Sequence, residues 1–77
     1  MSITVKFFAR LREELDIDTV QIDHQDNLSA LQVWQKVTKQ DELPDKILIA
    51  VNQEYANLTC IVKDNDEVAF FPPVTGG

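Results

Sequence analysis

Hydrophobic residues recur at two spacings along this chain, and the shorter spacing is typical of strands. Ile3, Val5 and Phe7 occupy alternate positions, which places them on one face of a strand. The same reasoning, applied to alternating segments and to apolar runs of strand length, predicts five strands, over residues 3–8, 19–23, 47–51, 58–62 and 67–71. The last strand ends at Pro72 and Pro73, because proline cannot donate to a sheet ladder.

The longer spacing is typical of helices. One stripe, at positions i, i+3, i+4 and i+7, consists of Ala30, Val33, Trp34 and Val37. Ser29 precedes the stripe, and Gln32 follows three residues later, the pattern of a capping box. The main helix is therefore expected to begin after Ser29 and to end near residues 39–40. Residues 9–15 are rich in helix formers and predict a second, short helix.

The predicted order is strand, short helix, strand, helix and three strands. One amphipathic helix lying across one face of a mixed sheet is the simplest way to bury these stripes. The pattern thus predicts an α+β fold, a β-grasp (ubiquitin-like) roll, in which the first and last strands lie parallel at the centre. With 77 residues, the chain has the length of one small domain, spanning 1–77.

The net charge of the chain limits the classes of partner that it is expected to bind. Seven basic and thirteen acidic residues give a net charge of −6, which disfavours binding to nucleic acids and to anionic membranes. The acidic surface favours a basic protein partner; the alternative is that the charge serves only to keep the protein soluble.

Cysteine content and hydropathy bear on the compartment. Cys60 is the single cysteine, so no internal disulfide can form, which fits a reducing compartment. We expect Cys60 to be a small buried residue of a strand. The N-terminal residues lack a signal-peptide pattern, and no apolar run reaches the length of a membrane span. The expected location is the cytoplasm.

Glycine is confined to the tail. The chain has two glycines, Gly76 and Gly77, and both follow the diproline. Two prolines favour an extended path, so residues 74–77 are expected to form a flexible functional tail that a narrow channel could admit. A carboxylate at Gly77 is ionised at neutral pH and reacts in acyl chemistry only after activation, for example by adenylation. The sequence has no phosphate-binding loop to do this itself, so we expect a carrier and not a catalyst.

The C-terminal motif is specific. Residues 66–77, DEVAFFPPVTGG, closely resemble the end of the small, sulfur-carrier subunit of molybdopterin synthase. Residues 51–53 (VNQ), 7–10 (FFAR) and 12–13 (RE) support the resemblance, whereas 16–46 match only in pattern.

The resemblance implies a mechanism. A ubiquitin-activating-like enzyme would use ATP to adenylate Gly77, and a persulfide sulfur donor would convert the adenylate to a thiocarboxylate. Gly76, Thr75 and Val74 would carry this group into the large catalytic subunit, where it would donate sulfur to a cyclic pyranopterin phosphate and build the dithiolene. The family's synthase is a heterotetramer. The chain itself is expected to bind no cofactor and no metal.

A docking surface is expected beside the tail. If the first and last strands are parallel neighbours, Phe8 and Phe71 point to the same face near the tail's origin, and Tyr55 could join them. The resemblance implies that such an apolar patch, with Pro72 and Pro73, holds the large subunit and the activating enzyme. The alternative is that the short helix covers Phe8 or Phe71.

Other residues are expected to be structural. Trp34 belongs to the core stripe, His24 to the surface at a strand end, and Arg10 and Arg12 to the surface, where they are candidate contacts of the activating enzyme. Three rival functions remain open: a sulfur carrier for thiamine or tRNA thiolation, a ubiquitin-like modifier attached through Gly77 to lysines, and a plain interaction module.

Overall fold

The computed structural model describes residues 2–44 and 46–73. The tail, residues 74–77, lies outside them. The elements in chain order are β1 (Ser2–Phe7), α1 (Ala9–Leu15), β2 (Thr19–Asp23), α2 (Ala30–Thr38), β3 (Leu48–Val51), β4 (Glu54–Ala56) and β5 (Glu67–Phe71). Within one or two residues at their ends, both helices and four of the strands match the elements predicted from the sequence.

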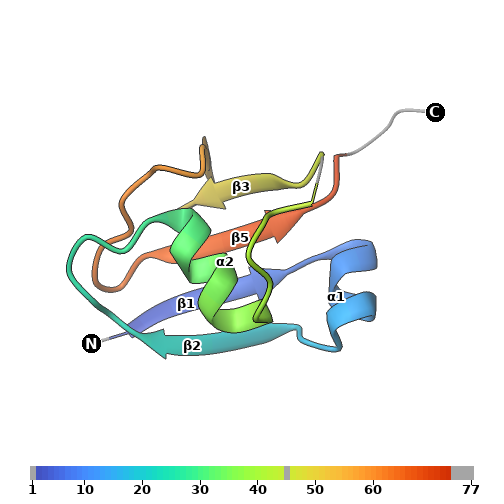
Figure 1. Ribbon diagram of the computed structural model, residues 1–77, viewed down its shortest axis with the longest axis horizontal. Coiled ribbons are helices and arrows are strands. Elements are labelled where there is room, and N and C mark those ends of the chain that lie inside the picture. The colour runs from blue at the N-terminus through green and yellow to red at the C-terminus, as the bar shows by residue number, and fades with distance from the viewer. Residues whose placement is uncertain (1, 45, 74–77) are drawn as a thin grey trace.

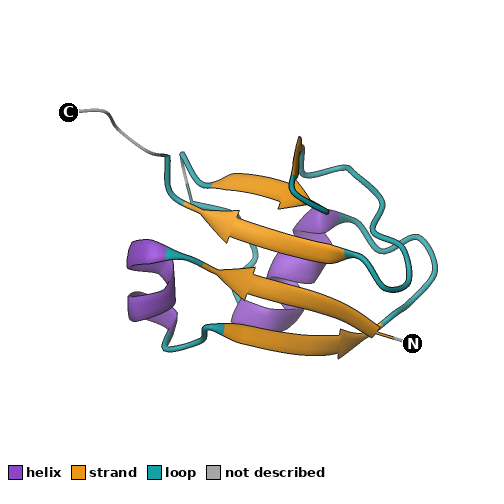
Figure 2. Cartoon of the chain, turned by 180° about the vertical axis from the view of Figure 1, so that it is seen from behind, coloured by secondary structure: helices purple, strands orange, loops and turns teal. Residues whose placement is uncertain are grey.

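The five strands form one mixed sheet in the order β2-β1-β5-β3-β4. The central pair, β1 and β5, is parallel, with Phe7 opposite Phe70, and the other pairs are antiparallel. Helix α2 crosses one face of this sheet (Figure 1). Seen from behind, the strands lie in front of α2 (Figure 2). This arrangement confirms the predicted β-grasp roll.

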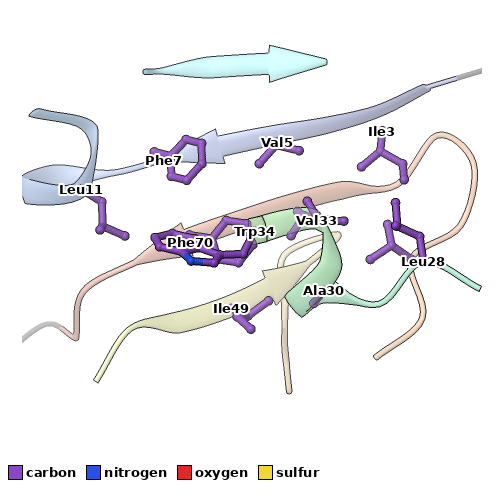
Figure 3. Packing of buried hydrophobic residues seen from close by; sticks show 12 residues of the cluster. Ile3, Val5, Phe7, Leu11, Leu28, Ala30, Val33, Trp34, Ile49 and Phe70 are labelled. Carbon is purple, nitrogen blue, oxygen red and sulfur yellow. The ribbon is translucent and has the colours of Figure 1, made fainter. Parts of the chain in front are cut away.

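The core lies between α2 and the sheet, where the side chains gather as the strand alternation predicts (Figure 3). Its centre is aromatic: the ring centroid of Trp34 lies 5.1 Å from that of Phe70 and 6.0 Å from that of Phe7, both edge to face. The three side chains are fully buried. The Trp34 indole Nε1 donates to the carbonyl of Glu42 at 3.1 Å, which satisfies its one polar group.

Helix α2 begins where the sequence predicts. The Ser29 hydroxyl accepts from the Gln32 amide N at 3.2 Å, and Gln32 Oε1 accepts from the Ser29 amide N at 2.9 Å, a complete capping box. The helix ends at Thr38 and is capped by Lys39, whose φ of 64° is left-handed and whose N–H donates to the carbonyl of Gln35. Both ends of α2 are thus set by local hydrogen bonds.

The strand predicted over residues 58–62 is wrong. Its place in the sheet is taken by β4, which returns along β3 after a tight turn at Asn52 and Gln53. Both turn residues have positive φ, 53° and 70°, as in the two-residue turns that match the twist of a hairpin. Glutamine at the second position, where glycine is usual, conceals this turn in the sequence.

Residues 57–60 instead form a turn closed by Asn57. Its carbonyl accepts from the Cys60 amide, and its side-chain Oδ1 accepts from the amide N and hydroxyl of Thr59 at 3.0 and 2.7 Å. Cys60 therefore lies in a loop and is half-buried, so the expectation of a buried strand cysteine is also wrong. His24 directly follows the end of β2, as predicted, and its side chain is half-buried.

Candidate functional site

The face of the sheet turned away from α2, which we call the outer face, carries the alternate side chains of the central strands. On β1 and β5 these residues are Ser2, Thr4, Lys6, Glu67, Ala69 and Phe71. Phe8 extends β1 by one residue. Its backbone is extended (φ −127°, ψ 155°), and its N–H donates to the carbonyl of Phe70 at 3.2 Å. The parallel register that pairs Phe7 with Phe70 therefore places Phe8 beside Phe71.

Tyr55 joins them from β4. Tyr55 lies opposite Ala50 on β3, and its ring centroid is 6.0 Å from that of Phe71. The Tyr55 side chain is 79% exposed and Phe8 is 45% exposed, whereas Phe71 is half-buried. Large aromatic side chains left this exposed, and gathered on one face, are typical of a surface that another protein covers.

Phe8 and Phe71 line one hollow in the outer face, with a volume of about 470 Å³. Its apolar lining is completed by Ala9, Ala69 and Pro72, and its polar lining comes from Lys6, Gln53 and Glu67; we call it the outer-face hollow. Of the predicted docking residues, three therefore meet in the hollow and Tyr55 lies against one of them. Pro73 is half-buried and does not line the hollow, and Val74, Thr75, Gly76 and Gly77 lie outside the described residues.

Helix α1 leaves the hollow open. The chain turns sharply after Phe8, with Ala9 at a φ of 54°, and the helix then directs Leu11 into the core. As a result α1 lies at the end of the sheet, beside the last residues of β1 and β5, and not across the outer face (Figure 2). Phe8 is exposed because of this turn, so the alternative in which the short helix covers it does not hold.

Sequence reasoning missed the polar part of the hollow. Lys6 Nζ lies 3.2 Å from Glu67 Oε1, and both side chains remain partly exposed, at 38% and 35%. Gln53 enters the hollow from the turn between β3 and β4. The alternation of β1 and β5 could have placed Lys6 and Glu67 on the same face as Phe8 and Phe71. It could not have shown that they form an ion pair, because that depends on the register of two strands far apart in sequence.

The described part of the chain has neither a group of metal-ligating side chains nor a helix that could cross a membrane. Among residues 2–44 and 46–73, no three His, Cys, Asp or Glu side chains are grouped so that they could hold a metal ion. Over the same residues, no helix has the length and hydropathy that crossing a bilayer requires.

Comparison with known proteins relates this architecture to one family. Residues 5–77 match the model of the ThiS family. The chain belongs to the ThiS family. Two curated relatives are molybdopterin synthase sulfur carrier subunits, from Escherichia coli at 40% identity and from Haemophilus influenzae at 37%. Each alignment covers 97% of this chain and 99% of the relative.

A solved structure shares the fold of this ThiS-family chain. The crystal structure of SAMP1 from Haloferax volcanii, a small archaeal modifier protein, superposes with a TM-score of 0.80 at 30% identity, over 100% of both chains. The family match supports the resemblance seen in the C-terminal motif, and the structural match supports the β-grasp topology.

Proposed function

We propose that this ThiS-family chain is the sulfur-carrier subunit of a molybdopterin synthase. The observation that carries the proposal is the end-to-end similarity to proteins of that name, at up to 40% identity, in a chain whose last residues read FFPPVTGG. The chain would be the non-catalytic partner of a large catalytic subunit, in a heterotetramer of two small and two large subunits, and it would act in the cytoplasm.

The chemistry is proposed to take place at Gly77. Its carboxylate attacks the α-phosphate of ATP in a ubiquitin-activating-like enzyme, which forms an acyl-adenylate and releases pyrophosphate. The terminal sulfur of a persulfide donor then attacks the acyl carbon, and AMP leaves. A thiol cleaves the resulting acyl disulfide by exchange, which leaves a thiocarboxylate on Gly77 and a disulfide on the donor. The thiocarboxylate delivers its sulfur to a cyclic pyranopterin phosphate held by the large subunit.

The outer face is proposed to hold the partners. β5 ends at Phe71 and leads through Pro72 and Pro73 toward the tail, so a protein seated on Phe8, Tyr55 and Phe71 would lie beside the tail's origin. Since the same aromatic surface would serve both the activating enzyme and the large subunit, the two partners would bind in turn. This order suits a carrier, which is loaded at one site and discharged at another.

The test is intact-protein mass spectrometry after incubation with ATP, an activating enzyme and a persulfide source, with fragmentation to locate any change. Localisation is needed because exchanging oxygen for sulfur adds nearly the same mass as oxidising Met1 or Cys60. A sulfur gain confined to Gly77 is expected. If a control carrier is loaded by the same enzyme while Gly77 is unchanged, the proposal fails.

A second candidate function is protein modification through Gly77, which the similarity to a small archaeal modifier protein favours. It predicts covalent conjugates between Gly77 and lysines of other proteins, seen as species of higher mass in cells. A sulfur carrier for thiamine or tRNA thiolation would also gain sulfur at Gly77. It would differ in failing to support dithiolene formation with the large subunit.

A further inference from the structure

The outer-face hollow contains an ion pair among apolar walls. Lys6 and Glu67 come from adjacent parallel strands, and Lys6 reaches back diagonally, since its direct neighbour on β5 is Ala69. The pair lies at 3.2 Å, and each side chain keeps more than a third of its surface exposed. Phe8, Phe71 and Pro72 border the same hollow. A partner that covers these apolar residues must therefore also cover the pair.

Both members of the pair have hydrogen-bonding capacity to spare. An ammonium group has three N–H donors, and a carboxylate accepts at two oxygens. Among the described residues, one contact joins them, between Nζ and Oε1, and no other hydrogen bond involves either side chain. Water satisfies the remaining donors and acceptor while the surface is exposed. Under a partner that offered only apolar atoms they would be left unsatisfied, which weakens binding.

The chemistry that complements this pair is a group that donates and accepts at once. The pair has no net charge, so an added charged group would gain from one member and be repelled by the other. A residue in an extended segment turns its own N–H and its own C=O to the same side, so it offers the C=O to a spare N–H of Lys6 and the N–H to the second oxygen of Glu67. An apolar side chain of the same segment would fill the space beside Phe8 and Phe71.

Resting on the proposed function, we infer that Lys6 and Glu67 determine which partner segment the hollow accepts. The segment belongs to the large synthase subunit and is an extended peptide. One of its apolar side chains lies between Phe8 and Phe71, and one of its residues bonds through its own C=O to Lys6 and through its own N–H to Glu67. The aromatic side chains supply the apolar contact, and the ion pair fixes the register of the segment.

The experiment measures the dissociation constant of the full chain and the large subunit by isothermal titration calorimetry. Lys6→Met and Glu67→Gln should each weaken binding at least tenfold. The double variant Lys6→Met/Glu67→Leu replaces the pair by apolar side chains of similar size and should also weaken binding at least tenfold. If the double variant binds as well as the unchanged chain, or more tightly, the pair makes no bond to the partner and the inference is wrong.

Two further variants test whether misfolding or the loss of two charges alone could explain weaker binding. The variant Lys6→Glu/Glu67→Lys keeps an ion pair on the sheet but exchanges donor and acceptor. It should fold normally and still bind the large subunit at least tenfold more weakly. Unchanged affinity contradicts the inference even if the apolar variant fails to fold.

The variant Lys36→Met/Glu42→Leu is the control for the loss of charge. It removes the same two charges from exposed positions in and just after α2, which covers the opposite face of the sheet. Its affinity for the large subunit should change less than twofold.

The outcomes separate this inference from the function on which it rests. If the unchanged chain does not bind the large subunit at all, the proposed function fails. If it binds and accepts sulfur at Gly77 while the Lys6 and Glu67 variants bind normally, only the present inference fails.

Discussion

Phe8 lies beside Phe71 at the ends of two parallel strands, and both face away from the core that their predecessors build. Phe7 and Phe70 are paired across β1 and β5, and their rings stack in the core at 5.6 Å. One strand register thus fixes two aromatic pairs, one for the core and one for the outer face. Because β5 precedes the tail in the chain, the proposed function assigns this outer pair to the surface on which a partner that acts on Gly77 is seated.

Replacing Phe71 or Phe8 by alanine should weaken binding to the large subunit by about tenfold or more, since truncating a large aromatic anchor typically costs at least about 1–2 kcal/mol of binding free energy. Phe8 is 45% exposed, so its loss should change the free energy of unfolding little. Surface plasmon resonance against immobilised large subunit provides the measurement.

Ile61→Ala is the matched control for that experiment. Ile61 is similarly exposed, at 47%, but bridges to Ser29 ahead of α2 and does not line the hollow. The dissociation constant of the Ile61→Ala variant for the large subunit should stay within about twofold of that of the unchanged chain, because substitutions outside an interface core change the binding energy little. If Ile61→Ala and Phe71→Ala lose equal affinity for the large subunit, the outer face is not the docking surface.

Deleting Gly77, or replacing Gly76 with leucine, should abolish sulfur transfer and leave the fold intact, because the buried core is built from residues between Ile3 and Phe70. Synthase activity with the thiocarboxylate-loading system gives the first readout. The unfolding midpoint, followed by fluorescence of the single tryptophan, gives the second. Activity retained by either variant would refute the role of the tail.

Trp34→Ala should destabilise the domain by about 3–5 kcal/mol, because it removes the largest buried side chain and leaves a cavity beside Phe7 and Phe70. A single hydrophobic core in a chain of about 70–80 residues rarely supplies more than about 3–5 kcal/mol, so much of this variant should be unfolded at room temperature. Urea denaturation followed by circular dichroism measures the effect. Tyr55→Ala, at an exposed aromatic position, should change stability by less than about 0.5 kcal/mol.

Lys39→Gly should stabilise the domain by about 0.5–1 kcal/mol. A left-handed φ costs a residue with a Cβ about 1–2 kcal/mol, and glycine avoids this at an entropic cost of about 0.5–1 kcal/mol in the unfolded chain. The same replacement at Lys36, an exposed position inside α2, should instead destabilise by about 1 kcal/mol. In urea denaturation, the free energy of unfolding should rise for Lys39→Gly and fall for Lys36→Gly. A change of the same sign for both variants would contradict the left-handed backbone at Lys39.

Elements with local signals could be predicted from the amino-acid pattern. Hydrogen bonds between Ser29 and Gln32 define the start of α2, and the every-second-residue placement of Ile3, Val5 and Phe7 defines the buried face of β1. Such patterns are readable because caps and side-chain periodicity depend on residues a few positions apart. The element order then left few ways to bury one helix against one sheet, and the predicted roll was among them.

Strand pairing and side-chain contacts between distant segments could not be predicted in this way, because they depend on the folded arrangement of the whole chain. The tertiary structure placed β4 at Glu54–Ala56 and left residues 58–62 outside the sheet, because a turn at Asn52 and Gln53 and a turn closed by Asn57 set the pairing. It also brought Lys6 to Glu67 inside an aromatic hollow. Alternation assigns a residue to a face, but only the register of strands separated by some sixty residues decides which side chains on that face meet.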